Sequence, residues 1–459
     1  MNTTTIMIIF VALVLLSWPR LHTRLLLSRA KHPSLRGHVR MARRVARLIP
    51  RYEYDGARFF CCDDAPDEVA SRRRAGFERL AGDLRTRHAA SIQASETLAP
   101  GVSDMQFVGR YRVPFQFSPL VREQLKITTL VSESAGVKLT DLDGNESYDL
   151  TGAYGVNLLG YDSYKDCIEA AVRRVGKLGP VLGPYHPVII DNVARLREIS
   201  GMDEVSFHMS GTEAVMQAVR LARYHTGRSH VVRFCGAYNG WWDDMQPGIG
   251  NPAPVGAVYT LKEMDDTTLR VLARKRNIAC VVVNPLQAMH PNSNAPGDST
   301  LIASDRAAGV DREAYSRWLG ELRRVCSAHG IALILDEVFV GFRLAYRGAQ
   351  EYFGVAADLL TYGKTLGGGL PVGVVCGKTH WMRRFREDRP ADICFARGTF
   401  NSHPYVMAAM NEFLTRIVQP DYQALYQHLD ATWESRAALM NRRLETAGVP
   451  VRVANLSSI

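Results

Sequence analysis

The chain contains 459 residues, of which 46% are hydrophobic and 22% are charged, and its formal net charge is +10 at pH 7. This composition is typical of a large globular protein and excludes a chain that is disordered throughout. The eight cysteines form no CxxC pair and no cysteine–histidine cluster, so the sequence predicts neither a zinc site, nor another metal site, nor a disulfide framework. Reduced cysteines of this kind indicate a reducing compartment.

The N-terminus begins with an uncharged segment that is apolar without interruption from Ile6 to Leu16. Its length lies near the lower limit for a membrane span, and we expect residues 1–19 to form a transmembrane anchor. Positive charge on the carboxyl side alone predicts that the rest of the chain faces the cytoplasm. The alternatives are organelle targeting, secretion (although the usual positively charged start is missing) and a solvated basic arm.

A strongly basic segment follows. Residues 20–51 carry ten arginines and lysines and no acidic residue, which equals the net charge of the whole chain. Such a segment can lie along an anionic membrane surface. No nucleic-acid-binding motif accompanies it, so we expect no nucleic-acid partner. Residues 59–100 begin with an acidic turn and then predict a helix that contains Phe77, Leu80 and Leu84.

Two turns mark the middle of the chain. Residues 143–145 read Asp-Gly-Asn, which predicts a hairpin turn. Residues 204–207 read as a strand, and Ser210, Gly211 and Thr212 then lead into a helix. Backbone amides at a helix N-terminus, beside a glycine that permits close approach, form an anion site. The alternative is an ordinary capped helix.

The most informative feature is a carboxylate followed by a lysine. Residues 331–335 form an apolar run typical of a buried parallel strand, and Asp336 stands at its carboxyl end, where open α/β sheets bind ligands. Lys364 lies in the glycine-rich turn 361–369. A pyridoxal phosphate enzyme needs this pair, because the lysine forms a Schiff base with the cofactor aldehyde and the carboxylate keeps the pyridine nitrogen protonated. We expect burial and a nearby cation to lower the pKa of Lys364. The alternative is a strand-end cap with a solvated lysine; a nucleotide phosphate loop is excluded because Asp358 occupies its glycine position.

The segment 331–378, with Gly-Phe-Arg at 341–343, Phe-Gly-Val at 353–355 and Pro-Val-Gly at 371–373, resembles the class III (subgroup II) pyridoxal phosphate aminotransferases. That family includes ornithine and 4-aminobutyrate aminotransferases and glutamate-1-semialdehyde aminomutase. The resemblance implies an α/β fold of fold type I, with a mostly parallel central sheet in a large domain and a smaller α+β domain. The expected division is a membrane-anchor extension over 1–19, a basic juxtamembrane arm and extension over 20–100, the N-terminal part of the small domain over 101–165, the large cofactor-binding domain over 166–400, and the start of a truncated C-terminal small domain over 401–459.

The resemblance also implies a role for each candidate site residue. Lys364 and Asp336 are the catalytic residues; Ser210, Gly211 and Thr212 hold the cofactor phosphate; Tyr238 stacks on one face of the pyridine ring and Val338 packs on the other; Gln287 bonds the phenolic oxygen; and Thr399 reaches the phosphate bound by the neighbouring subunit of a homodimer. The chain departs from the family at four positions, with Asn239 in place of histidine, Asn284 in place of glutamate, and Met209 and His403 in place of asparagine.

The function expected is an aminotransferase that moves an amino group from a small-molecule donor to an aldehyde, ketone or keto-acyl acceptor. The predicted membrane anchor favours a lipidic or carrier-bound acceptor and places a membrane-anchored enzyme on the cytoplasmic side, with organelle-targeted and soluble cytoplasmic forms as alternatives. An aminomutase of the glutamate-1-semialdehyde type is the first alternative function. A non-catalytic membrane-associated scaffold is the second: Asn284, His403 and the early end favour it, whereas Lys364 and Asp336 argue against it.

Overall fold

The structure is a computed structural model that describes residues 3–111, 113–126, 130–254, 256–289, 309–449 and 451–459. The chain divides into two compact units. The larger unit contains the described residues of Met1–Ala46, Asp166–Ala295 and Ala307–Ile459, and the smaller unit contains those of Arg47–Lys165.

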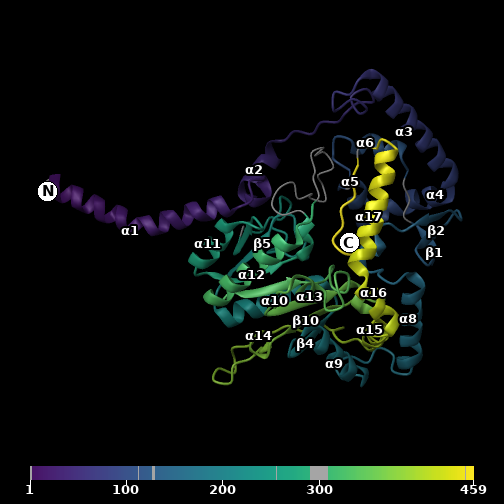
Figure 1. Ribbon diagram of the computed structural model, residues 1–459. Coiled ribbons are helices and arrows are strands. Elements are labelled where there is room, and N and C mark those ends of the chain that lie inside the picture. The colour runs from purple at the N-terminus through teal and green to yellow at the C-terminus, as the bar shows by residue number, and fades with distance from the viewer. Residues whose placement is uncertain (1–2, 112, 127–129, 255, 290–308, 450) are drawn as a thin grey trace. The chain divides into compact units, whose positions relative to one another are not determined.

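A seven-stranded sheet forms the centre of the larger unit (Figure 1). Its order is β4 (Glu204–His208), β10 (Gly373–Gly377), β9 (Leu359–Gly363), β8 (Ala332–Asp336), β7 (Ile278–Val283), β5 (His230–Phe234) and β6 (Val258–Leu261). The strands from β9 to β6 pair in parallel, whereas β10 pairs antiparallel with both β9 and β4. The mostly parallel sheet implied by the family resemblance is confirmed.

The central strands are buried on both faces. Strands β7, β8 and β9 are buried along their whole lengths, which explains why their sequences read as continuous apolar runs. Helix α10 (Gly211–Thr226) packs over the sheet with small side chains, because Ala214 and Ala218 belong to the same buried cluster as Ile334 and Val375. This packing fixes the N-terminus of α10 at the edge of the sheet that carries Asp336.

The other helices that the structure describes are distributed over both units. In chain order they are α1 (Thr3–Ala30), η1 (Leu35–Gly37), α2 (Val39–Leu48), α3 (Asp67–Arg87), α4 (Ala89–Leu98), η2 (Ala99–Gly101), α5 (Ser103–Tyr111), α6 (Ser118–Gln124), α7 (Gly152–Gly155), α8 (Tyr161–Val175), α9 (Val188–Ser200), α11 (Asp266–Arg274), η3 (Pro285–Met289), α12 (Arg312–His329), α13 (Gly348–Phe353), η4 (Lys364–Gly367), α14 (Thr379–Met382), α15 (Pro404–Ile417), α16 (Pro420–Gln427) and α17 (Leu429–Thr446). Helix α3 confirms the helix predicted within residues 59–100.

The N-terminal segment requires a correction. Among the helices that the structure describes, none is both long enough and apolar enough to cross a membrane. The predicted transmembrane anchor over residues 1–19 is therefore not supported, because the apolar run from Ile6 to Leu16 is shorter than the roughly 20 residues of a typical span. Helix α1 continues to Ala30 and packs against α11, where Leu26 and Ala30 are buried.

Part of the basic segment also contacts the larger unit. Lys31 forms an isolated β-bridge with Leu261, next to the last residue of α1. Farther along, the guanidinium of Arg43 donates hydrogen bonds to the carbonyl oxygens of Gly248 (3.3 Å) and Ala253 (2.7 Å). These contacts show that Lys31 and Arg43 take part in packing within the larger unit, to which residues 1–46 belong.

The smaller unit contains a three-stranded antiparallel sheet. Its strands are β1 (Val131–Ala135), β2 (Lys138–Asp141) and β3 (Glu146–Tyr148), in that order. Residues 143–145 connect β2 to β3, and Gly144 adopts a φ of 79° that favours glycine. The hairpin turn predicted from the sequence is confirmed.

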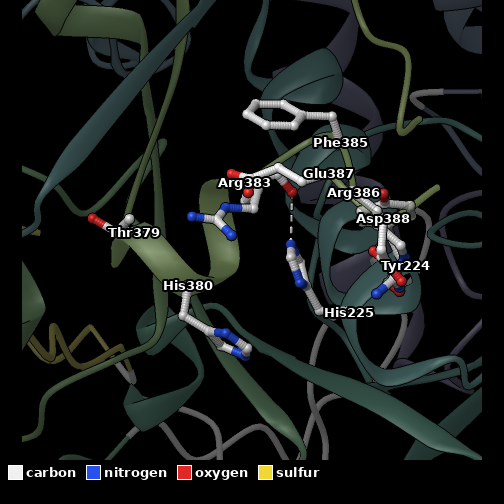
Figure 2. A pocket seen from close by; sticks show the side chains of 9 residues that line it. All are labelled: Tyr224, His225, Thr379, His380, Arg383, Phe385, Arg386, Glu387 and Asp388. Carbon is white, nitrogen blue, oxygen red and sulfur yellow. Dashed lines mark hydrogen bonds between the residues drawn. The ribbon is translucent and has the colours of Figure 1, made fainter. Parts of the chain in front are cut away.

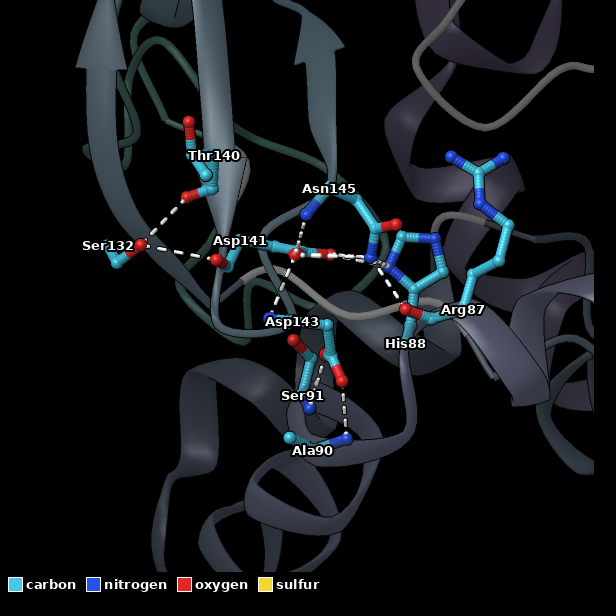
Figure 3. Close-up of polar contacts among 9 residues, drawn as sticks. All are labelled: Arg87, His88, Ala90, Ser91, Ser132, Thr140, Asp141, Asp143 and Asn145. Atoms are coloured by element: carbon cyan, nitrogen blue, oxygen red, sulfur yellow. Dashed lines mark hydrogen bonds and ion pairs between the residues drawn. The ribbon is translucent and has the colours of Figure 1, made fainter.

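Acidic side chains of this hairpin join it to the start of α4 (Figure 3). The Asp143 carboxylate accepts hydrogen bonds from the backbone amides of Ala90 (2.7 Å) and Ser91 (2.8 Å), in the manner of a helix cap. The Asp141 carboxylate lies 2.5 Å from Nδ1 of His88. The ligand atoms of His88, Asp141 and Asp143 lie within 4.8 Å of one another, close enough to hold a metal ion. Their hydrogen bonds already account for the cluster as a structural junction.

Candidate cofactor site

Asp336 is a buried, hydrogen-bonded carboxyl group at the carboxyl edge of the large sheet. It is the last residue of β8 and only 3% of its surface is exposed. Its Oδ1 accepts hydrogen bonds from the amide of Val338 (3.1 Å) and the hydroxyl of Thr361 (3.2 Å), while its Oδ2 accepts one from Nδ2 of Asn239 (2.7 Å). Burial raises the pKa of Asp336 above its ordinary value, and the Asn239 hydrogen bond opposes this effect.

Lys364 lies at the same edge because β8 and β9 are parallel neighbours. Asp336 pairs in register with Thr361, and Lys364 follows the last residue of β9. Its φ of 48° is unusual for a residue other than glycine, and such strain is typical of functional positions. The sequence prediction that brings Asp336 and Lys364 to one edge agrees with this geometry.

The environment of Lys364 favours its neutral form. Burial lowers the pKa of Lys364, the Asp336 carboxylate opposes this shift, and the Arg343 guanidinium adds to it. The Lys364 Nζ and the Arg343 guanidinium carbon lie 5.4 Å and 5.3 Å from the ring centre of Phe339. Arg343 therefore supplies the nearby cation that the sequence analysis expected without naming it. It is 8% exposed, which its position in a Gly-Phe-Arg motif did not reveal.

A second buried carboxyl group adjoins Asp336. Glu337 is 1% exposed and accepts a hydrogen bond from the amide of Ala349 (2.7 Å). A Cβ atom at Gly348 would lie 2.5 Å from Glu337 Oε2, so only glycine leaves room for this carboxyl group. Burial raises the pKa of Glu337 to about 8. Burial thus favours the neutral form of this carboxyl group, which the sequence analysis did not single out.

The predicted phosphate turn begins helix α10. Ser210 is its N-cap and accepts a hydrogen bond from the amide of Glu213 at 3.2 Å. A Cβ atom at Gly211 would lie 2.6 Å from Cγ1 of Val338, so the glycine lets the helix N-terminus approach the end of β8. The amides at this N-terminus can hold an anion, as predicted. Ser210, Gly211 and Val338 are thus brought together.

The segment that carries Tyr238 reaches the same region. Gly240 has a φ of 93°, and a Cβ atom there would lie 2.9 Å from Oγ1 of Thr212. The Tyr238 carbonyl accepts a hydrogen bond from Nδ2 of Asn284 at 3.3 Å, and the Tyr238 side chain is 53% exposed. Gln287 is buried in η3, where its backbone amide donates a hydrogen bond to the backbone carbonyl of Asn284.

Thr399 has a different environment. It is exposed, in a turn that precedes α15, and Phe400 beside it is 50% exposed. Its predicted role concerns a neighbouring subunit and stays a prediction.

A surface pocket of about 660 Å³ lies away from these residues (Figure 2). It is lined by Tyr224 and His225, at the C-terminal end of α10, together with residues around α14. The predicted phosphate turn is at the other end of the same helix, and Gly211 lies roughly 20 Å from Tyr224 at 1.5 Å per residue. This pocket is therefore not the site built around Asp336 and Lys364.

Comparison with known proteins decides the family. Residues 120–246 and 300–447 match the family described as Aminotransferase class-III. The chain belongs to this class III aminotransferase family. The resemblance identified from the sequence is thereby confirmed, and so is pyridoxal 5′-phosphate, the cofactor that it implied.

Individual relatives and solved structures are consistent with this family. A glutamate-1-semialdehyde 2,1-aminomutase from Nitratidesulfovibrio vulgaris is 32% identical to this class III chain over 332 residues, which cover 72% of the chain and 75% of the relative. The solved structure of an omega-transaminase from Sphaerobacter thermophilus is 27% identical in sequence and has a TM-score of 0.60. The match covers 72% of this chain and 74% of the other. A glutamate-1-semialdehyde aminomutase from Pseudomonas aeruginosa, 20% identical with a TM-score of 0.66 and coverage of 84% and 83%, shows the same fold.

The residues of this class III chain fit the cofactor. Asp336 Oδ2 accepts one hydrogen bond, from Asn239, so it keeps a lone pair for a pyridine N–H. Gly211 and Gly363 lack the Cβ atoms that would crowd Val338, and the helix N-terminus beside them suits a phosphate. The buried carboxylate also needs a cationic partner to offset its burial, which a pyridinium would supply.

Proposed function

We propose that the chain is a pyridoxal phosphate-dependent aminotransferase that moves an amino group from a small-molecule donor to an aldehyde, ketone or keto-acyl acceptor. The observation that carries the proposal is the pair of Asp336 and Lys364 at neighbouring strand ends, one buried and hydrogen-bonded, the other shifted towards its neutral form. When bound, the cofactor supplies an aldehyde that condenses with amines and a ring that accepts electrons.

The chain's own groups have separate tasks. Lys364 in its neutral form attaches the cofactor and, once displaced by the amino donor, takes the proton from the α-carbon of the substrate. Asp336 accepts the pyridine N–H and keeps the ring cationic. Burial and, to a smaller extent, the positive charge of Arg343 lower the pKa of Lys364 and so favour its neutral amine. Val338 packs on one face of the pyridine ring.

The remaining predicted contacts complete the proposed site. The amides of Ser210, Gly211 and Thr212 bind the phosphate, Tyr238 stacks on the exposed face of the ring, Gln287 bonds the phenolic oxygen, and Thr399 serves the phosphate in the second subunit of a homodimer. Tyr238 is half-exposed, as a residue that awaits a ligand would be.

The lipidic or carrier-bound acceptor is not proposed again. Its support was the predicted transmembrane anchor, which no described helix provides. The acceptor is therefore proposed only by its reactive group, a carbonyl.

An aminomutase is the second candidate function. The support is the 32% identity to a relative with the name glutamate-1-semialdehyde 2,1-aminomutase. A mutase moves an amino group within one molecule, so it needs no separate amino donor. Assays of glutamate-1-semialdehyde with and without added amino donors separate the two reactions.

The cofactor site is tested by chemical trapping. The purified chain is mixed with pyridoxal phosphate, treated with borohydride to fix the cofactor to the lysine that holds it, and digested for mass spectrometry. The proposal expects the modification on Lys364. Modification spread over surface lysines such as Lys378, with none on Lys364, would refute it.

A further inference from the structure

We propose that Asn239 is a positioning residue that holds the Asp336 carboxylate and the Tyr238 segment in one fixed arrangement. This inference rests on the proposed function for its consequences, although the contacts themselves exist in the protein without a cofactor.

The first support is the geometry around Asp336. Val338 and Thr361 both donate to Oδ1, whereas the donor recorded for Oδ2 is Asn239, at the shortest of the three distances. Rotation about the Cβ–Cγ bond moves both oxygens, so the donors on Oδ1 and the Asn239 donor on Oδ2 together fix the plane of the carboxylate. Asn239 is the donor that holds Oδ2, the oxygen with which a pyridine N–H would bond.

The second support is the position of Asn239 in its segment. Tyr238 before it is bonded to Asn284 through its carbonyl, and Gly240 after it packs on Thr212. Three consecutive residues thus contact the ends of β8 and β7 and the start of α10. Since Asn239 is 1% exposed, its bond to Asp336 anchors the segment that presents the Tyr238 ring.

The third support is the buried oxygen of the same amide. Among the described residues, Asn239 Oδ1 is buried without a hydrogen-bond partner. Reversing the amide would place this oxygen against the Asp336 carboxylate, so the orientation is decided by that bond alone. A buried oxygen without a hydrogen-bond partner is unfavourable, so the favourable contribution of this side chain comes from its Nδ2 donor.

An amide also differs from histidine, the residue of the resembling family at this position, because its charge does not change with pH. The charged group that acts on Asp336 is Lys364, which is in turn influenced by Arg343, and Glu337 adjoins Asp336 along the chain. With Asn239 the donor itself does not titrate, so the arrangement around Asp336 changes only when these groups change.

The first test needs no cofactor. Urea unfolding of the cofactor-free protein is compared at pH 5 and pH 8 for Asn239→Ala and for Asn192→Ala. Asn192 is a matched control, since it is fully buried and bonded to neutral groups, the Met407 carbonyl and the Asn411 amide. A hydrogen bond to an ionised group contributes more than one to a neutral group.

The fold-decrease in the folding equilibrium constant caused by Asn239→Ala should be roughly five- to tenfold greater at pH 8 than at pH 5. Burial raises the pKa of Asp336, so its ionised form, which accepts the stronger hydrogen bond, is favoured by higher pH. The decrease in the folding equilibrium constant caused by Asn192→Ala should be equal at pH 5 and pH 8. An Asn239→Ala effect independent of pH would reduce the residue to ordinary packing and overturn the inference.

The second test adds pyridoxal phosphate and measures its dissociation constant and visible absorbance. Asn239→Ala should bind roughly ten- to a hundredfold more weakly, and Asn239→Asp more weakly still because two carboxylates then meet. Asn239→His should restore binding in part, with a pH dependence that the parent lacks. Binding within twofold of the parent in Asn239→Ala would overturn the inference. If the parent itself fails to bind, the proposed function fails, while the unfolding comparison still decides the role of Asn239.

Discussion

Substitution of Gly211 by alanine should disrupt the junction between the start of α10 and the end of β8. The added Cβ would lie 2.6 Å from Val338 Cγ1 and 3.0 Å from its Cγ2, well inside the roughly 3.5–4.0 Å optimum for carbon atoms. Val338 cannot retreat easily, because its amide donates a hydrogen bond to Asp336, which holds its backbone at the end of β8.

The expected magnitude follows from overpacking, which costs about 1–3 kcal/mol. We expect the free energy of unfolding of Gly211→Ala to fall by about 2 kcal/mol. Movement of Val338 would also pull the amide donor from Asp336, so the affinity for pyridoxal phosphate should fall by roughly tenfold.

The assay is a double-mutant cycle measured by urea unfolding and by pyridoxal phosphate binding. Val338→Ala removes both clashing carbons and leaves only the Val338 Cβ, at 3.4 Å. The double variant should therefore recover part of the loss, with a coupling of about 1–2 kcal/mol. Gly320→Ala is the matched control, since a Cβ there meets nothing within 4 Å and a helix gains stability from the change. Equal stabilities for the Gly211 and Gly320 variants, or strictly additive effects in the cycle, would refute the reasoning.

Three further predictions concern charge and assembly. Asp336→Asn should lower the transamination rate about 100-fold by removing the partner of the pyridine nitrogen, and an unchanged rate would contradict its role. Burial raises the pKa of Glu263, bonded to Tyr315 at 2.6 Å, to about 8, so its stabilising contribution is present in acid and lost as pH rises towards that value. Glu263→Gln should accordingly remove about 1.4 kcal/mol per pH unit from the slope of unfolding free energy between about pH 5 and pH 7.5; an unchanged slope would show that Glu263 is ionised in the folded protein. Finally, if sites are shared in a homodimer, mixing inactive Lys364→Ala with impaired Thr399→Glu should restore activity through mixed dimers, whereas subunits with self-contained sites would show none.

The strand-end pair could be predicted from the sequence because local patterns specify it. A continuous apolar run places Asp336 at the end of a buried strand, and the rule that parallel strands share their carboxyl edge brings Lys364 beside it. The turn at Ser210 and Gly211 was likewise predictable from a cap followed by a helix. Each of these signals lies within a few residues of the position concerned.

The contacts that were missed join distant parts of the chain. Asn239 is 97 residues from Asp336 in sequence, and a departure from a family residue gives no indication of which atom it will contact. Arg343 is buried although charged residues are usually exposed, so composition argues against its actual place.

The prediction of a transmembrane anchor at the N-terminus was not supported, for a different reason. An apolar run suits either lipid or a protein surface, and sequence hydropathy alone does not separate them. In the structure the helix that starts there continues past the apolar run, and its later residues Leu26 and Ala30 pack on the larger unit.

The most direct test of the central claim is the visible absorbance of the purified chain with pyridoxal phosphate, compared between the parent, Lys364→Ala and Lys378→Ala. Lys378 is an exposed lysine of the same unit that bonds the carbonyl of Gly201, so its loss controls for non-specific attachment. The account predicts a yellow band in the parent and in Lys378→Ala, bleached by an amino donor, and no such band in Lys364→Ala. An equally strong band in Lys364→Ala, or a parent that takes up no cofactor, would contradict it.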